Sequence, residues 1–233
     1  MIVENLAVLR RKIEETCKRS SRKSEDVKLI AVSKYFGVDK IIEAKNCGLT
    51  DFGENRAQEL TLKFEKLGNE VVWHFIGSLQ KNKVKYAVKA AELIHSVDSL
   101  ELLEEINQRA EKLDKVQNIL LEVKTSEEES KSGLETETEI LSLVKRCSEL
   151  KNIQLKGFMT MAPLTDDTKI IRKSFADLRN LKDKINNKGY NLTELSMGMT
   201  SDFEIAIEEG STMIRVGSAI FGDRDYSKDW RQI

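Results

Sequence analysis

Two stretches near the end of the chain decide its fold: LSMGMTSDF at residues 195–203 and MIRVGS at residues 213–218. Each reads as a short apolar strand that runs into glycine and hydroxyl residues before a helix begins. Backbone N–H groups and hydroxyls converge at such a turn, and together they favour a bound anion. In a barrel of parallel strands, the loops after the last two strands commonly hold a phosphate. The two stretches therefore predict a (β/α)8 barrel and a phosphate ligand at once.

Short apolar runs alternate with longer amphipathic segments along the chain. The runs are compact, as expected for parallel strands that are covered on both faces. Eight such runs can be counted, at residues 28–33, 51–53, 71–76, 93–97, 119–123, 153–158, 192–195 and 213–216. Apolar residues recur at helical spacing between them, for example at Ile171, Phe175, Leu178 and Ile185. We therefore expect an α/β fold in which strands and helices alternate.

One helical segment, at residues 2–17, precedes the first strand. A later segment places Leu100, Leu103, Ala110 and Leu113 at helical spacing, and we expect these residues to form a buried face. Eight strand and helix units after one extra N-terminal helix fit a single TIM-type barrel better than an open sheet.

The composition agrees with one barrel domain over residues 1–233. With 40% hydrophobic residues the chain can bury a large core, and its charges nearly cancel to a net −1. This balance gives no bias toward nucleic acid or an anionic membrane. Cys17, Cys47 and Cys147 lack paired or ligand-like spacing, which favours free thiols and argues against a structural metal. No uncharged apolar run approaches the roughly 20 residues that span a bilayer. We expect a cytoplasmic protein.

Two cationic residues stand at strand ends, where a barrel builds its site. Lys34 follows the apolar residues 29–32, and a desolvated lysine can attack an aldehyde as the neutral amine to form a Schiff base. A lysine at a strand end can also be structural or solvated, and Arg215 can be part of an ordinary ion pair. A nucleophilic lysine beside a phosphate site points to pyridoxal 5'-phosphate (PLP). A guanidinium near the pyridine nitrogen would keep that nitrogen unprotonated and weaken the cofactor as an electron sink.

Several further blocks in the chain form a recognisable series. They are LIAVSK at 29–34, FGEN at 52–55, WHFIG at 73–77, SVDS at 96–99, SKSG at 130–133, GFM at 157–159, LSMGM at 195–199 and GSTMIRVGSAIFG at 210–222. In this order the blocks resemble the pyridoxal phosphate homeostasis protein family over essentially the whole chain. The resemblance implies a barrel like the N-terminal domain of alanine racemase.

The resemblance also implies roles for individual residues. It makes Lys34 the lysine that holds PLP as a Schiff base, and it places Arg215 at the pyridine nitrogen and Asn55 near the ring. It assigns the residues that we call the phosphate cup, which are Ser196, Met199, Thr200, Gly217 and Ser218. Lys131 lies in a matching block, although a lysine in such a polar loop is usually solvated.

The remaining polar candidates have simpler interpretations. His74 lies inside an apolar strand, where a hydrogen-bonded barrel histidine is expected rather than a catalytic base. His95 carries no signal of function. The cysteines have no neighbouring base at a recognisable spacing, so we interpret them as buried apolar residues rather than nucleophiles.

The expected function is a PLP-binding regulator or carrier without substantial catalytic turnover. In the racemases that resemble this barrel, the base on the opposite face of the substrate comes from a second, β-rich domain, for which a chain ending at Ile233 leaves no room. The expected partners are PLP and PLP-dependent apo-enzymes that accept it, and the expected state is a monomer. Two alternatives stay open: a weak PLP-dependent amino-acid racemase, and a barrel enzyme in which Lys34 reacts with a phosphorylated sugar.

Overall fold

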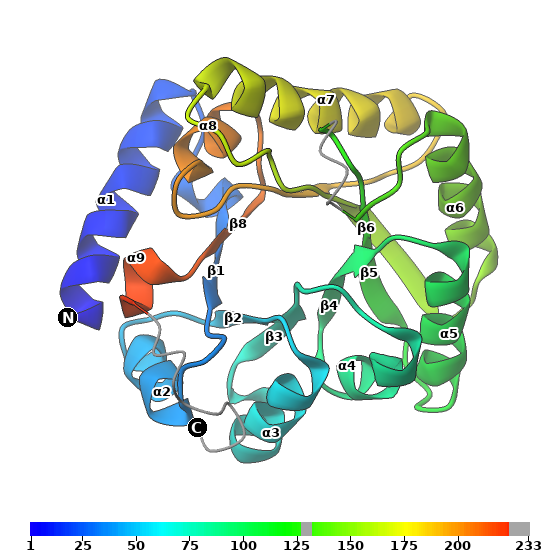
Figure 1. The fold of residues 1–233 in the computed structure, drawn as a ribbon, viewed down its shortest axis with the longest axis horizontal. Helices are drawn as coiled ribbons and strands as arrows, with labels where there is room; N and C mark the ends of the chain where they lie inside the picture. Colours follow the sequence, from blue (N-terminus) through cyan, green and yellow to red (C-terminus); the bar gives the residue numbers. More distant parts are fainter. Residues whose placement is uncertain (127–131, 224–233) are drawn as a thin grey trace.

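The computed structural model describes residues 1–126 and 132–223, in which parallel strands close into a barrel ringed by helices (Figure 1). The strands follow the chain order around the barrel, and β1 closes it by pairing with β8. They are β1 (Lys28–Val32), β2 (Asp51–Glu54), β3 (Val72–Phe75), β4 (Leu93–Val97), β5 (Gln117–Glu122), β6 (Ile153–Met159), β7 (Glu194–Ser196) and β8 (Met213–Val216). The predicted (β/α)8 barrel is confirmed.

Each strand is followed by a helix, and one helix precedes them all. The helices are α1 (Ile2–Arg19), α2 (Val38–Asn46), α3 (Ala57–Leu67), α4 (Val84–Ala90), α5 (Leu100–Glu111), α6 (Glu137–Glu149), α7 (Thr168–Asn186), α8 (Phe203–Glu208) and α9 (Ser218–Phe221). The extra helix α1 is the one that the sequence predicted. Short 3-10 turns lie at Ser24–Asp26, Gly68–Glu70 and Lys81–Lys83.

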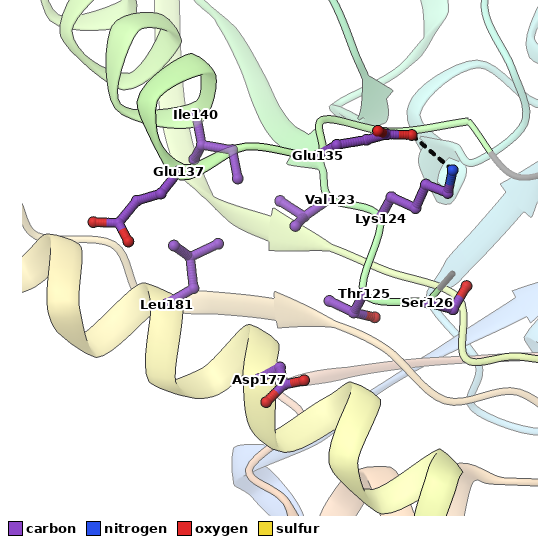
Figure 2. Close-up of a pocket in the computed structure, with 9 residues that line it drawn as sticks. All are labelled: Val123, Lys124, Thr125, Ser126, Glu135, Glu137, Ile140, Asp177 and Leu181. Carbon is purple, nitrogen blue, oxygen red and sulfur yellow. Dashed lines mark hydrogen bonds and ion pairs between the residues drawn. The ribbon is translucent and has the colours of Figure 1, made fainter. Parts of the chain in front are cut away.

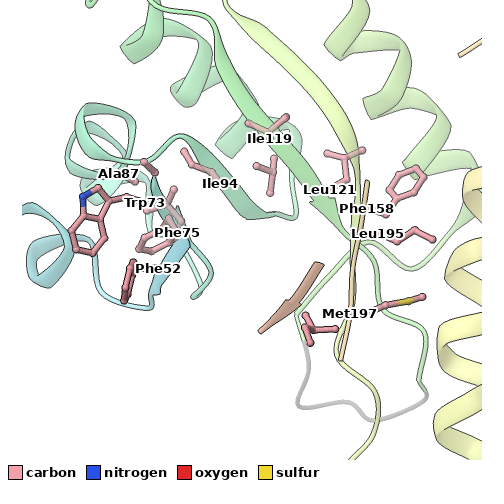
Figure 3. Close-up of a cluster of buried hydrophobic side chains, with 14 of the residues drawn as sticks. Phe52, Trp73, Phe75, Ala87, Ile94, Ile119, Leu121, Phe158, Leu195 and Met197 are labelled. Carbon is pink, nitrogen blue, oxygen red and sulfur yellow. The ribbon is translucent and has the colours of Figure 1, made fainter. Parts of the chain in front are cut away.

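Successive residues of each strand point to opposite sides of the barrel wall. The outward residues pack under the helices as the main core, in which Phe52, Trp73 and Phe75 gather on one side (Figure 3). The inward apolar residues form a separate small cluster, which contains Ile30, Leu93, Leu120, Met159 and Met213. Polar side chains, among them His74, His95 and Arg215, occupy much of the remaining interior.

Two details of the predicted pattern are wrong. Leu100 and Leu113 are 46% and 52% exposed, because Leu100 is the first residue of α5 and Leu113 lies beyond its end. The predicted Leu103 and Ala110 are buried, and Leu102 and Ile106 complete the buried face of α5.

Helix α1 packs against the two helices that follow the last strands. The side-chain amide of Asn5 donates to the Ile220 carbonyl of α9 at 2.9 Å. Arg22, just beyond α1, donates to the Ile207 carbonyl of α8 at 2.7 Å, and Arg19 pairs with Glu204 at 3.1 Å. The extra helix therefore holds α8 and α9 in place.

In the described part of the chain, no helix combines the length and the apolar character needed to cross a bilayer. Within the same residues, no three His, Cys, Asp or Glu side chains are grouped so that they could hold a metal ion. Cys17, Cys47 and Cys147 are free thiols, as predicted. Burial raises the pKa of Cys147 to about 12, which fits an inert thiol.

Candidate functional site

The loops after β7 and β8 meet at the carboxyl end of the barrel. The Ser218 hydroxyl lies 3.4 Å from the Thr200 hydroxyl, although the two residues are 18 positions apart. Ser218 is the first residue of α9, so its N–H group has no acceptor within the helix. The structure thus brings together two hydroxyl residues of the predicted phosphate cup.

The loop after β7 depends on Gly198. Its φ of +96° is a backbone conformation that side chains disfavour, and a Cβ at this position would lie 2.5 Å from the Ala206 Cβ on α8. The Gly198 carbonyl accepts from the Arg215 amide at 2.9 Å, which ties this loop to β8. Tight packing therefore fixes the loop that carries Met199 and Thr200.

The other residues of the phosphate cup take different places. Gly217 is buried directly before α9, and Met199 is 36% exposed. The Met199 amide donates to Asp202 Oδ1 at 2.5 Å, so this amide is already occupied. Ser196 is fully buried inside the barrel, where its hydroxyl contacts Arg215 and His95 rather than the Thr200 and Ser218 pair.

Arg215 is a buried cation surrounded by neutral oxygens. Its Nη1 donates to the Ser196 carbonyl at 2.8 Å and to the Ser196 hydroxyl at 2.6 Å, and its Nη2 donates to the Thr160 carbonyl at 3.0 Å. A guanidinium has five N–H donors, so the Nε–H and one N–H on Nη2 have no acceptor among the described residues. Burial lowers the pKa of Arg215 to about 10, with Asp202 and Glu122 opposing the change. Arg215 therefore stays charged near neutral pH with donors to spare.

Lys34 follows β1 and is half-buried. The residues on either side of it are held by a buried ion cluster on β2 and α3. Lys63 Nζ donates to the Ser33 carbonyl at 2.9 Å, and the Tyr35 amide donates to Glu59 Oε1 at 2.8 Å. Tyr35 has a φ of +67°, which a non-glycine residue adopts only when its surroundings impose it. The cluster thus fixes the backbone that presents Lys34.

The ion cluster contains one ammonium and two carboxyl groups. Lys63 Nζ lies 2.6 Å from Glu54 Oε1 and 2.8 Å from Glu59 Oε1, and the Ser33 hydroxyl donates to Glu54 at 2.6 Å. The second oxygens of Glu54 and Glu59 are buried without a partner in the described residues. Burial raises the pKa of Glu54, while the Lys63 charge opposes the rise. Sequence analysis missed Lys63, whose only signal was its position on the apolar face of α3.

Asn55 follows β2, as predicted, at the same end of the barrel. It is half-buried, and its Oδ1 has no hydrogen-bond partner among the described residues. A Cβ on Gly77 would lie 2.4 Å from the Asn55 carbonyl, so the loop after β3 passes directly over the Asn55 backbone. This close contact fixes the backbone of Asn55, whose Oδ1 is available to accept a hydrogen bond from a ligand.

Two acidic residues lie at the ends of β4 and β5: Asp98 directly follows β4, and Glu122 ends β5. Glu122 is the last residue of β5 and is 4% exposed. Burial and the Asp98 carboxylate raise the pKa of Glu122 to about 7, against the pull of the Arg215 charge. Burial also raises the pKa of Asp98. Glu122 can therefore change its charge near neutral pH.

His74 is buried and hydrogen-bonded, as predicted. Its Nε2 lies 2.9 Å from Asp51 Oδ1, and its Nδ1 lies 3.0 Å from His95 Nε2. Sequence analysis assigned no role to Asp51 or His95. Their inward positions on β2 and β4, in line with His74 on β3, were the signal that could have grouped them.

A different cavity, of about 560 Å³, lies outside the barrel against α6 and α7 (Figure 2). Its lining includes the carboxylates Glu135, Glu137 and Asp177, and the cation Lys124 is paired with Glu135 at 2.6 Å. An acidic lining of this kind disfavours a phosphate. Lys131, in the matching block at 130–133, lies outside the described residues.

The chain is similar to one family of proteins over nearly its whole length. Residues 5–225 match the family model described as alanine racemase, N-terminal domain. The pyridoxal phosphate homeostasis protein of Aquifex aeolicus is 42% identical over 226 residues, covering 96% of this chain and 98% of that protein. The protein of the same name in Helicobacter pylori is 43% identical over 199 residues, covering 84% of this chain and 87% of that one.

Solved structures show the same similarity. PipY of Synechococcus elongatus PCC7942, solved with PLP bound, is 36% identical with a TM-score of 0.83, over 95% of this chain and 100% of that chain. An alanine racemase of Clostridium difficile 630 has a TM-score of 0.77 at 17% identity, over 97% of this chain and 58% of that chain. The second likeness shows the fold alone.

Proposed function

This chain belongs to the family of alanine racemase N-terminal domains and, within it, to the pyridoxal phosphate homeostasis proteins, and on that premise we propose that it binds PLP on Lys34. Its role is to hold and release PLP inside the cell, as a regulator of the free cofactor. The proposed location is the cytoplasm, where PLP-dependent apo-enzymes would accept the cofactor from a monomer. The observation that carries the proposal is the buried guanidinium of Arg215, which has N–H donors left over for a ligand.

Three features of the site fit three parts of the cofactor: its phosphate, its ring nitrogen and its ring hydroxyl group. The paired hydroxyls of Thr200 and Ser218, at 3.4 Å, suit a phosphate. The spare N–H groups of Arg215 suit an unprotonated ring nitrogen, which is an acceptor. The unpartnered oxygen of Asn55 suits a donor at the edge of the ring, such as its hydroxyl group. Met199 and Gly217 would complete the phosphate cup, while Ser196 would act through Arg215.

When bound, PLP supplies an aldehyde carbon for covalent attachment and a ring that can accept electrons. Lys34 would provide the amine that bonds to the aldehyde carbon. The ion cluster of Glu54, Glu59 and Lys63 would keep the flanking backbone, and with it the Lys34 side chain, in one orientation. Arg215 would donate to the ring nitrogen without transferring a proton, because an arginine gives up its proton only at high pH.

This assignment favours a holder of PLP over a racemase. A racemase gains rate when the ring withdraws electrons from the substrate carbon, and a ring nitrogen that stays unprotonated withdraws fewer. Amino-acid turnover would also need an acid and a base on opposite faces of the substrate. We therefore expect tight binding of PLP with little or no loss of optical activity from amino acids.

The test is the visible absorbance of the purified protein with PLP, before and after borohydride, for wild type and Lys34→Ala. The wild type should be yellow, and borohydride should fix the label on the peptide that contains Lys34. Lys34→Ala should lose the colour, whereas Lys40→Ala, which removes an exposed lysine on α2, should keep it. A colourless wild type, or a label on another lysine, would refute the proposal.

A further inference from the structure

Five side chains from five strands form one continuous line of hydrogen bonds through the barrel. Asp51 Oδ1 on β2 lies 2.9 Å from His74 Nε2 on β3, and His74 Nδ1 lies 3.0 Å from His95 Nε2 on β4. His95 Nδ1 lies 2.9 Å from the Ser196 hydroxyl on β7, which lies 2.6 Å from Arg215 Nη1 on β8. We call this line the Asp51–Arg215 relay. Its side chains come from positions up to 164 residues apart, so only the closed barrel assembles it.

The relay is largely shielded from water. Asp51 is 7% exposed, His74 1%, His95 and Ser196 0%, and Arg215 4%. A buried polar group that lacks a partner is costly, so each member depends on its neighbours. The loss of one hydrogen bond therefore affects the whole line.

With both imidazoles neutral, the chemistry of the two ends fixes the direction of every hydrogen bond. Arginine can only donate, and an ionised carboxylate can only accept. Burial alone would raise the pKa of Asp51, but hydrogen bonds from His74 and Thr50 and the charge of Lys28 lower it to about 2. Arg215 must therefore donate to Ser196, which donates to His95 Nδ1. His95 Nε2–H then donates to His74 Nδ1, and His74 Nε2–H donates to Asp51.

An additional proton would break this order. If His95 carried a proton on Nδ1, it and Arg215 would both donate to the Ser196 hydroxyl, whose own hydrogen would then need another acceptor. The charges near the relay act in the same direction at His95. Burial lowers the pKa of His95 well below its usual value, and any positive charge on His74 adds to the effect, as do the charges of Arg215 and Lys28.

Each end of the relay meets other charged groups. At the Asp51 end, Lys28 Nζ lies 3.1 Å from Asp51 Oδ1, and both residues line a cavity of about 860 Å³ at the amino ends of β1 and β2. At the other end, the carboxylates of Glu122 and Asp202 influence Arg215. The relay therefore links the charged groups at the amino ends of β1 and β2 to those around Arg215.

We propose that Asp51, His74, His95 and Ser196 are positioning residues that hold Arg215 in the orientation that its ligand requires. They do so through one fixed direction of donation along the relay, which we call the proton order. The proposal deepens the proposed function, because it names what aims Arg215 at the ring nitrogen of PLP. It predicts that both imidazoles are neutral with the proton on Nε2. It also predicts that the Ser196 hydroxyl faces His95 rather than the phosphate.

The proton order can be read directly in the ligand-free protein by NMR. The chain has two histidines, so labelling with 15N-histidine gives one pair of ring nitrogens for each. Both imidazoles should show the proton on Nε2, and His95 should stay neutral down to about pH 5.5, below the ordinary histidine pKa. His74→Gln and His95→Gln assign the signals. A proton on Nδ1 of either ring, or a His95 that titrates near its usual pKa, would overturn the proposal.

A pair of serine variants separates positioning from stability. Ser196→Ala removes the donor to His95 Nδ1, whereas Ser96→Ala removes a buried hydroxyl on β4 that donates to the Gly77 carbonyl, outside the relay. In Ser196→Ala the His95 Nδ1 signal should move to that of an unbonded nitrogen, and Ser196→Thr should restore it. Ser96→Ala should leave both rings unchanged. Equal spectra for Ser196→Ala and wild type would refute the relay even where a variant lowers stability.

The cofactor provides a second readout. With PLP bound, Ser196→Ala should weaken the affinity about tenfold, the size expected for one lost hydrogen bond, and should alter the pH dependence of the visible absorbance. Ser96→Ala should keep the wild-type pH dependence, and a pH dependence of Ser196→Ala equal to the wild type would also overturn the proposal. The NMR result does not depend on PLP. A confirmed proton order in a colourless protein would support the relay and refute the proposed function. A yellow protein with a different proton order would support the proposed function and refute the relay.

Discussion

The barrel removes three ionisable side chains from water, and burial affects the charge of each differently. They are Arg215, Glu122 and Asp51. Asp51 keeps its charge because His74, Thr50 and Lys28 stabilise the carboxylate. Arg215 keeps its charge because an arginine pKa starts so high that burial leaves it at about 10. Glu122 lacks a hydrogen-bonded cation among the described residues, so its pKa rises to about 7. Glu122 therefore gains or loses its negative charge when the pH changes around neutrality, and this charge acts on Arg215.

Glu122→Gln should change how stability depends on pH. The folded-state pKa of Glu122 lies above the ordinary value of 4.5, so its stabilising contribution is complete below that value and is lost as the pH rises through about 7. Glutamine cannot ionise, so the variant should exceed the wild type by about 3 kcal/mol in the free energy of unfolding near pH 8. The two proteins should be similar near pH 4.5. Urea unfolding across this range measures the difference.

Glu65→Gln is the matched control, because Glu65 is exposed on α3. It should follow the wild type at every pH. A Glu122→Gln variant with the wild-type pH slope would contradict the raised pKa of Glu122.

The sequence could indicate which residues meet at the site, but not what each polar atom contacts. Thr200, Ser218 and Arg215 stand next to strand ends in a recognisable barrel, so their approximate location follows from the strand order. The contacts of Ser196 do not follow, because they depend on His95, 101 residues away, and on which side of β7 faces the interior. Lys63 was missed for a similar reason, since a lysine on a helix is solvated in most proteins.

At the scale of elements, the structure shows why strand positions were predictable and their ends less so. Every predicted strand exists, because compact apolar runs covered on both faces are a strong signal. The seventh was expected at residues 192–195, whereas β7 spans Glu194–Ser196. The Asn186 side chain explains the shift. It bonds both the amide and the carbonyl of Leu192, at 2.8 and 2.9 Å, so this apolar residue is buried without joining the sheet.

Gly198→Ala should damage the loop between β7 and α8. The variant combines a φ of +96° with a Cβ only 2.5 Å from the Ala206 Cβ. We expect a loss of about 3 kcal/mol in the free energy of unfolding, from backbone strain and overpacking together, and a weaker affinity for PLP. Chemical denaturation and a PLP titration measure the two effects.

Gly189→Ala is a close control for backbone strain alone. Gly189 has the same φ of +96°, but a Cβ added there would meet open space, with nothing within 4 Å beyond the adjoining residues. Its loss should be about 1 kcal/mol with no change in PLP affinity. Equal losses for the two variants would show that contact with α8 does not constrain the loop.

At the scale of the whole molecule, α1 adds something that the eight strand and helix units lack. The barrel is closed by β1 and β8, and α1 lies across α8 and α9 on the outside of that closure (Figure 1). The helical spacing of residues 2–17 predicted the helix, but a pattern along one segment cannot say which distant helices will receive its apolar face.

Asn5→Ala tests this contact. The change leaves the Ile220 carbonyl without the amide that donates to it at 2.9 Å, so the free energy of unfolding should fall by about 1 kcal/mol. Hydrogen exchange should become faster in α9 as well as in α1. Val8→Ala, at a residue 46% exposed on the same helix, should stay within about 0.5 kcal/mol of the wild type. Unchanged exchange in α9 would contradict a supporting role for α1.

The contact between α1 and α9 also orders events during protein synthesis. Ile2–Arg19 leaves the ribosome first, whereas Thr200 and Ser218 leave it late, after Lys34 has long been exposed. A growing chain therefore carries Lys34 before it has the loops that would secure a phosphate, and α1 is made before the helices that it supports. On the proposed function, loading with PLP would follow translation, so the amount of cofactor held would rise with the number of finished molecules rather than with the number being made.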